Sequence, residues 1–142
     1  MSGRSGRSRW GVTCWRVTTV TILVVGIAVL PVAAQDRWVA PAETKAKQNP
    51  VRRATGTKDG KAAYETNCAT CHGPRGKGDG PVAASLNPRP RNLGDKAIQE
   101  QTDGELFWKI SEGRGPMAPW KHLDEKTRWS LVHYIRSFAA KN

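Results

Sequence analysis

The 142-residue sequence predicts a small all-α domain in which three main helices are joined by long loops. No segment sustains the alternation of apolar and polar residues that is typical of a half-buried strand. Three windows instead combine helix start signals with apolar residues at helical spacing. The segments His72–Pro81 and Asn87–Arg91 are rich in glycine and proline and therefore favour loops. We assign one domain to residues 57–142, a length at which a side-chain core alone is marginal.

The first helix is predicted over Lys58–Asn67. Asp59 lies in its opening turn, where the helix dipole favours a negative charge. The helix ends directly before Cys68, so it fixes the position of that residue next to the core of the domain.

The second helix begins at a capping box, Thr102–Glu105, in which the two side chains satisfy each other's backbone N–H groups. Leu106, Phe107 and Ile110 follow as an apolar face. Gly113 is a natural C-terminal stop because glycine readily adopts the conformation that ends helices.

The third helix starts near Asp124, a good N-cap. Its apolar stripe recurs at helical spacing and consists of Leu131, Tyr134, Ile135 and Phe138. Arg136 and Lys141 lie toward its end, where positive charge suits the helix dipole.

Residues 1–34 have the composition of a secretory signal peptide. Four arginines and no acidic residue precede the apolar run Val17–Leu30, and small residues up to Ala34 indicate cleavage there. The alternative is an uncleaved membrane anchor, because Val17–Ala34 has eighteen residues, the lower limit for a spanning helix. In both cases the domain is exported. We expect it in the periplasm, either free or anchored to the membrane and facing the periplasm.

Residues 35–56 are rich in proline, alanine, lysine and arginine and show almost no apolar periodicity. Trp38 and Val39 are the only sizeable apolar residues of its first part. This composition predicts a flexible N-terminal linker.

The segment Cys68-Ala69-Thr70-Cys71-His72 predicts covalent attachment of one haem c. Two thiols at this spacing suit thioether bonds to the two vinyl groups on one edge of the porphyrin. His72 follows at once and is then the proximal ligand of the iron. A thiol redox pair or half of a zinc site would use the same cysteines, but the adjacent histidine favours haem.

With this motif, residues 57–142 resemble the class I monohaem cytochromes c. Gly60 and Tyr64 precede Cys68 by eight and four residues, as a glycine and an aromatic residue do in that family. Tyr134 matches the partner aromatic of the last helix. The resemblance implies the small cytochrome c fold, in which the first and last helices cross closely and loops wrap the haem.

The resemblance also implies the remaining contacts of the iron. Pro81 stands where the family has a proline whose carbonyl accepts the Nδ1–H of the proximal histidine, a contact that tunes the iron. Met117 lies in a loop, Gly113–Trp120, that resembles the loop carrying the distal methionine. The family often has a proline directly after this methionine, whereas Ala118 intervenes here.

Two histidines are rival distal ligands. His122 lies five residues from Met117 and would reach the iron only if the loop refolded. We expect His133 to be a solvated helix histidine, because it lies off the apolar stripe of the third helix.

The chain is strongly basic, with a formal net charge of +11 that falls to +7 when the four arginines of the leader are removed. Nucleic-acid binding is not predicted, because the basic residues are dispersed and no nucleic-acid motif occurs. The charge suits a redox partner with an acidic docking surface or an anionic membrane surface. The loops expected to flank the haem carry Arg75, Lys77, Arg89 and Arg91.

With Met117 on the iron, both axial positions are filled and no site is open for bond chemistry. The sequence therefore predicts a single-electron carrier that is not itself an enzyme, either soluble or as the cytochrome subunit of an oxidoreductase complex. The alternative is a haem enzyme with a labile distal ligand that acts on a small molecule.

Overall fold

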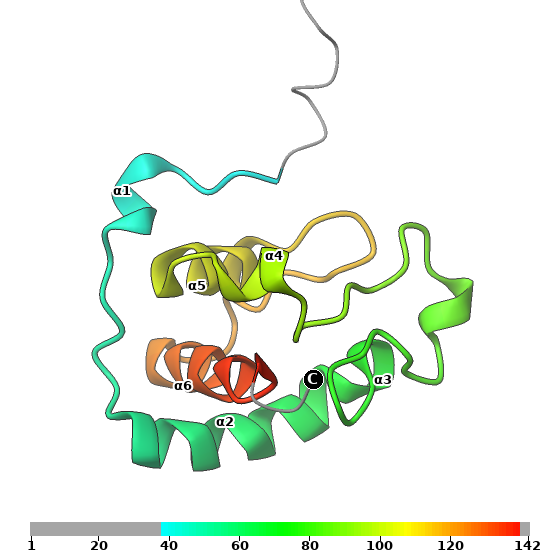
Figure 1. The fold of residues 1–142 in the computed structure, drawn as a ribbon, viewed down its shortest axis with the longest axis horizontal. Helices are drawn as coiled ribbons and strands as arrows, with labels where there is room; N and C mark the ends of the chain where they lie inside the picture. The colour runs from blue at the N-terminus through cyan, green and yellow to red at the C-terminus, as the bar shows by residue number, and fades with distance from the viewer. Residues whose placement is uncertain (1–37, 140–142) are drawn as a thin grey trace, which may run out of the picture. The chain divides into compact units, whose positions relative to one another are not determined.

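The computed structural model describes residues 38–139, so the predicted leader lies outside the described residues. Seven short elements follow one another in this range (Figure 1): α1 (Ala42–Lys45), α2 (Arg53–Asn67), α3 (Ala69–His72), the 3₁₀ turn η2 (Ala83–Ser85), α4 (Lys96–Gln99), α5 (Asp103–Glu112) and α6 (Glu125–Arg136). No strand occurs among the described residues, and the predicted all-α class is confirmed. In the same range, no helix is both long enough and apolar enough to cross a membrane.

Helices α2 and α6 cross at close quarters, as the resemblance implied. A Cβ atom on Gly60 would overlap the backbone carbonyl of Ser130, so only glycine allows this approach. Next to the crossing, the rings of Tyr64 and Tyr134 lie 5.1 Å apart. The two aromatic residues therefore fill the angle between the helices.

Helix α6 lies between α2 and α5, which explains why more of it is buried than its apolar stripe predicted. Toward α5, the Trp129 ring stacks on Phe107 with centroids 4.0 Å apart. All residues from Trp129 to Ile135 are buried. The core of the domain is thus the apolar layer on both sides of α6.

The predicted starts of α5 and α6 are confirmed. Thr102 and Glu105 form the capping box of α5, and Gly113 ends that helix with a φ of +64°. The Asp124 carboxylate accepts the N–H of Thr127 at 2.8 Å. Helix α6 ends at Arg136, earlier than the predicted end near Lys141.

Arg136 is the last residue of α6, and its side chain reaches the segment around the start of α5. Its guanidinium donates to the Asp103 carboxylate at 2.8 Å and to the carbonyl oxygen of Gln99 at 2.7 Å. The end of α6 is thereby tied to the start of α5.

The prediction of a flexible linker over residues 35–56 was wrong for the part that the structure describes. Residues 38–52, here called the strap, run along α5 and α6, and α2 begins at Arg53 instead of Lys58. Ala40 is buried, and the Asn49 side-chain amide donates to the Trp129 carbonyl oxygen at 3.0 Å. The anchoring residues are isolated in a strap without periodicity, so the sequence gives no signal of them.

The expectation for His133 was also wrong. Its side chain is buried, with 6% of its surface exposed, and its Nε2 lies 2.7 Å from the carbonyl oxygen of Val51. A carbonyl oxygen only accepts hydrogen bonds, so Nε2 carries the proton. His133 therefore fastens the strap to α6 and is not a solvated residue.

Candidate functional site

The cysteine-histidine motif lies where α2 ends and α3 begins (Figure 1). The Cys68 N–H donates to the Tyr64 carbonyl oxygen at 2.8 Å and so completes α2. The N–H of His72 donates to the Cys68 carbonyl oxygen at 2.9 Å, within the single turn of α3. The structure thus brings Cys68, Cys71 and His72 together in one helical turn.

Both thiols of the motif are free and half-buried. Burial, together with the neighbouring Cys71, raises the pKa of Cys68 to about 12. Cys68 is therefore a neutral thiol at neutral pH.

The imidazole of His72 is held in one tautomer. Its Nδ1 lies 3.2 Å from the carbonyl oxygen of Arg91, and because that oxygen only accepts, Nδ1 carries the proton. The lone pair of Nε2 is then left for a metal. Burial lowers the pKa of His72, while the bond to Arg91 acts in the opposite direction. The ring is thus favoured in the neutral form that metals require.

This contact corrects the role predicted for Pro81. The loop containing Pro81 folds back on α3 instead, because the Gly80 N–H donates to the Cys71 carbonyl oxygen at 3.2 Å. The carbonyl at His72 comes from the second loop, where Arg91 follows Pro90. A proline has no N–H and favours extended neighbours, so such a segment leaves carbonyl groups unpaired. The prolines next to Arg91 are therefore the sequence feature that could have indicated its carbonyl as the partner of His72.

Glycines allow the two loops to meet behind His72. Gly78 has a φ of +75°, and a Cβ atom there would overlap the carbonyl of Pro90. The N–H of Leu93 donates to the Gly76 carbonyl oxygen at 2.6 Å. The Arg91 carbonyl therefore lies in a segment that contacts the first loop on both sides, at Pro90 and at Leu93.

Tyr64 links the helix crossing to the motif. Its hydroxyl donates to the Gly73 carbonyl oxygen at 2.7 Å, inside the protein. Burial raises the pKa of this phenol, with smaller contributions from Cys68 and Tyr134, so the hydroxyl remains a donor. The end of α3 is thereby held against the core.

Met117 lies on a separate loop, between α5 and α6. Arg114 and Met117 exchange two backbone hydrogen bonds, at 2.9 and 3.0 Å, which makes residues 114–117 a tight turn. The N–H of Trp120 donates to the Ile110 carbonyl oxygen at 3.1 Å and fastens the loop to α5. The Met117 side chain is half-buried.

The rival histidines differ in their surroundings. His122 is exposed, with its ring 5.2 Å from that of Trp120. His133 donates its Nε2–H to the Val51 carbonyl oxygen of the strap. Residues 38–139 contain no group of three or more His, Cys, Asp or Glu side chains that could hold a metal ion.

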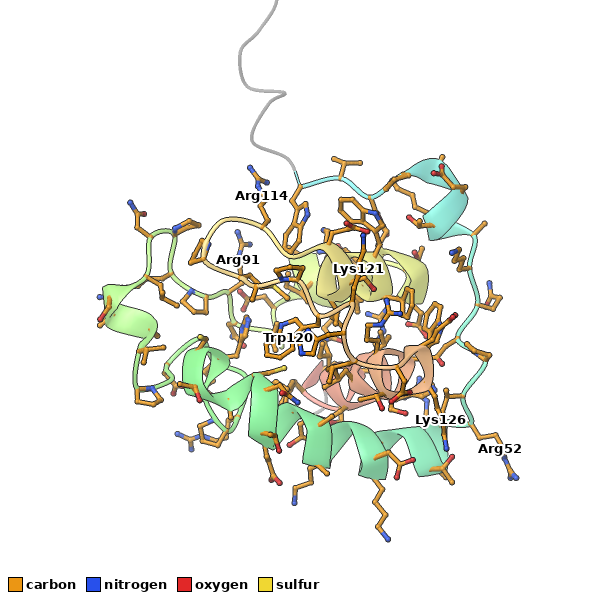
Figure 2. The ribbon with its side chains drawn as sticks, turned by 180° about the vertical axis from the view of Figure 1, so that it is seen from behind. Arg52, Arg91, Arg114, Trp120, Lys121 and Lys126 are labelled. Atoms are coloured by element: carbon orange, nitrogen blue, oxygen red, sulfur yellow. The ribbon has the colours of Figure 1, made fainter. Side chains whose placement is uncertain are left out.

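Several apolar side chains in the motif and in the loop that contacts it are only partly buried against the core, among them Cys68, Ala69 and Leu93. Such a surface can be covered by a flat apolar group. Exposed basic residues surround it on the loops; Figure 2 shows Arg91 and Arg114 projecting from the loops before α4 and after α5. The surroundings of the motif are thus apolar inside and basic at the rim.

Residues 55–135 match the family model described as cytochrome c oxidase, cbb3-type, subunit III. The cbb3-type cytochrome c oxidase subunit CcoP of Azospirillum brasilense is 35% identical over 92 residues, which are 59% of this chain and 29% of that protein. Subunit FixP of the cbb3-type oxidase of Bradyrhizobium diazoefficiens is 32% identical over 91 residues, 62% of this chain and 29% of that protein. The chain thus spans less than a third of the length of these relatives.

A solved structure supports the fold alone. A chain of the reducing HAO-like protein complex of Kuenenia stuttgartiensis superposes with a TM-score of 0.54 at 24% identity, over 75% of this chain and 53% of that chain. Together with the family match, the likeness confirms the small cytochrome c fold.

The predicted c-type cytochrome domain and its cofactor, one haem c with its iron, are confirmed by the family match. The matched range contains the whole cysteine-histidine motif and the loop of Met117. More than half of the chain lies inside the family model, and the chain therefore belongs to the cytochrome c family of cbb3-type oxidase subunit III.

Proposed function

We propose that this chain carries single electrons through one haem c, as the cytochrome subunit of an oxidoreductase complex outside the cytoplasmic membrane. The observation that carries the proposal is the geometry of the motif. Cys68, Cys71 and His72 lie in one helical turn, and the hydrogen bond from His72 Nδ1 to the Arg91 carbonyl oxygen leaves the Nε2 lone pair for a metal. These are the donors that covalent haem attachment requires.

The residues of the site fit haem. Cys68 and Cys71 would form the two thioether bonds, and the half-exposed apolar side chains beside them would cover the macrocycle. His72 would bind the iron through Nε2, while its Nδ1–H stays on the Arg91 carbonyl. That bond fixes the ring and makes the imidazole a better donor. Bound in this way, haem c supplies a one-electron Fe(III)/Fe(II) couple.

Met117 is our proposal for the distal ligand. A thioether is a soft, neutral donor that favours Fe(II) and raises the reduction potential relative to a second imidazole. The tight turn at residues 114–117 fixes the backbone that carries this side chain. With Met117 in place, small molecules are kept from the iron, and electron transfer is favoured over bond chemistry.

The subunit role rests on the relatives, both of which are named as subunits of cbb3-type cytochrome c oxidases. A soluble carrier is the other form that the same site would serve. In either form, we propose that Arg75, Lys77, Arg89 and Arg91 attract an acidic surface of the redox partner. All four side chains are exposed on the loops near the motif. The export of the domain, with or without an N-terminal anchor, is part of the same proposal.

Absorption spectroscopy of the purified protein tests the assignment. We expect haem absorption that survives denaturation, and a weak Met-to-iron charge-transfer band in the oxidised protein. Met117→Ala should abolish this band and allow rapid binding of cyanide or carbon monoxide, whereas the matched variant His122→Ala should change neither. A charge-transfer band that persists in Met117→Ala would exclude Met117 as the distal ligand. Rapid carbon monoxide binding to the reduced wild-type protein would favour the enzyme alternative.

A further inference from the structure

The loop that carries Met117 is held at its base by one side chain of α6, that of Arg128. This side chain is half-buried. Its Nε–H donates to the carbonyl oxygen of Leu123 at 3.1 Å, and its Nη1 donates to the hydroxyl group of Ser111. Ser111 lies in the last turn of α5, just before the loop, and Leu123 lies at the far end of the loop. A single guanidinium thus joins both ends of the loop.

The surroundings of the Arg128 guanidinium strengthen both hydrogen bonds. Its Cζ lies 4.7 Å from the centre of the Phe107 ring, a distance at which a cation is attracted to an aromatic face. Ser111 is buried, and its hydroxyl donates onward to the Phe107 carbonyl oxygen at 2.8 Å. Hydrogen bonds from a charged donor are stronger than neutral ones, and partial burial reduces their screening. The contacts of Arg128 therefore oppose opening of the loop.

A second contact across the same loop is exposed to water. The Lys121 Nζ lies 2.7 Å from the carboxylate of Glu112, the residue that follows Ser111. Lys121 comes from the loop between α5 and α6 (Figure 2). The two side chains are 60% and 37% exposed, so the ion pair contributes little to loop closure. It joins nearly the same parts of the chain as Arg128 does, and it is therefore a matched control.

We propose that Arg128 is a positioning residue for the distal ligand: by closing the loop, it keeps Met117 on the iron of the oxidised protein. A thioether favours Fe(II), so its bond to Fe(III) is the weaker one. In the oxidised protein, closure of the loop then decides how often Met117 leaves the iron. An open loop admits small molecules to the iron, so Arg128 favours electron transfer over bond chemistry. The inference rests on the proposed ligation by Met117.

Imidazole binding to the full-length, haem-loaded, oxidised protein tests this role. At high imidazole concentration the binding rate becomes independent of concentration, and this limiting rate measures how often Met117 leaves the iron. Arg128→Lys keeps the charge but loses the fork that reaches both ends of the loop, so it should raise the limiting rate about tenfold or more. Ser111→Ala should also raise it, and by a smaller factor in the Arg128→Lys protein than in the wild type. Lys121→Gln should raise it by less than about threefold.

Two further measurements separate positioning from a general loss of stability. The Trp120 N–H is bonded to the Ile110 carbonyl oxygen, so its hydrogen exchange reports opening of the loop without reference to the iron. This exchange should be faster in Arg128→Lys than in the wild type. His133→Leu removes a hydrogen bond to the strap instead of one to the loop, and it should leave the limiting rate of imidazole binding nearly unchanged.

The outcomes distinguish this inference from the proposed function. An unchanged limiting rate in Arg128→Lys, with Met117→Ala still faster than the wild type, would overturn the role of Arg128 alone. Equal acceleration by Arg128→Lys and His133→Leu would also overturn it, because the effect would then be one of stability. Equal rates in the wild type and Met117→Ala would overturn the ligation by Met117 and this inference together. If Arg128→Lys folds poorly, Ser111→Ala provides the same test.

Discussion

Gly60 of α2 lies directly against the backbone carbonyl of Ser130 in α6, so close that a Cβ atom on residue 60 would overlap that carbonyl. The contact sets the distance between the two helices, and Tyr64, one turn further along α2, packs its ring on Tyr134 beside it. Because Cys68 follows one turn later, this crossing also fixes the place of the haem motif.

Gly60→Ala should therefore destabilise the whole domain. The added methyl group can be accommodated only if α2 and α6 move apart, and we expect a loss of about 2–3 kcal/mol in the free energy of unfolding. Denaturant unfolding of the haem-loaded protein measures it. Thr66→Ala, on the exposed face of the same helix, should change the stability by less than about 0.5 kcal/mol. Equal stability of Gly60→Ala and wild type would contradict the observed helix distance.

The bond between His133 and Val51 predicts a local effect on the strap. His133→Leu leaves the Val51 carbonyl without its donor in a buried place, which should cost about 1–3 kcal/mol. The strap should also open more often, so limited trypsin digestion should cut faster after Arg52 and Arg53. His122→Ala, at an exposed position, is the control and should leave the cleavage rate unchanged.

Sequence reasoning reached the features whose signal is local and missed those that depend on tertiary contacts. The capping box at Thr102 and the N-cap at Asp124 form through nearby backbone groups, so their residues predict them. The start of α2 has no such signal: Arg52 provides no side-chain cap, and the first turns are held by packing on α6. The prediction that His133 is solvated was wrong for the same reason, because its hydrogen-bond partner, Val51, is 82 positions away in the sequence.

The candidate site also has one part that the sequence predicts and one part that depends on tertiary contacts. Cys68, Cys71 and His72 are adjacent in sequence, and the helical turn that joins them was predictable. The hydrogen bond of His72 connects residues 19 positions apart across two loops, and sequence reasoning named the wrong carbonyl, that of Pro81 in place of Arg91. Several prolines follow the motif, and only the folded loops distinguish between them.

His72 contacts the backbone carbonyl of Arg91 and not its side chain. A substitution of the Arg91 side chain is therefore a control for one that moves the backbone. Arg91→Ala keeps the carbonyl and should leave the reduction potential nearly unchanged. Gly78→Ala places a methyl group against the Pro90 carbonyl and should displace the Arg91 segment. A weaker bond makes the imidazole a poorer donor to Fe(III), so the potential should rise, by about 60 mV for a tenfold change in the redox equilibrium. Equilibrium redox titration measures the reduction potential of both variants. A larger shift in Arg91→Ala than in Gly78→Ala would argue against this hydrogen bond.

Glu105 predicts how stability depends on pH. Burial would raise the pKa of this carboxyl group, but the Thr102 N–H and the Lys45 ammonium outweigh burial and lower the pKa below its ordinary value of 4.5. As the pH falls, the unfolded chain therefore binds the proton first. The stabilisation from the carboxylate is complete above the ordinary pKa and is lost as the pH falls through the lower pKa of the folded state.

Glu105→Gln isolates this effect, because glutamine can still close the capping box but carries no charge. At neutral pH the variant should be less stable by about 0.3–1 kcal/mol, the usual contribution of a negative charge in the first turn of a helix. The difference should disappear in acid, where Glu105 is protonated in both states. Urea unfolding of both proteins between neutral and acidic pH measures this convergence. Glu65→Gln, at an exposed position in the last turns of α2, is the control and should follow the wild-type curve. A gap between wild type and Glu105→Gln that stays constant down to the lowest pH would show that the charge is not the cause.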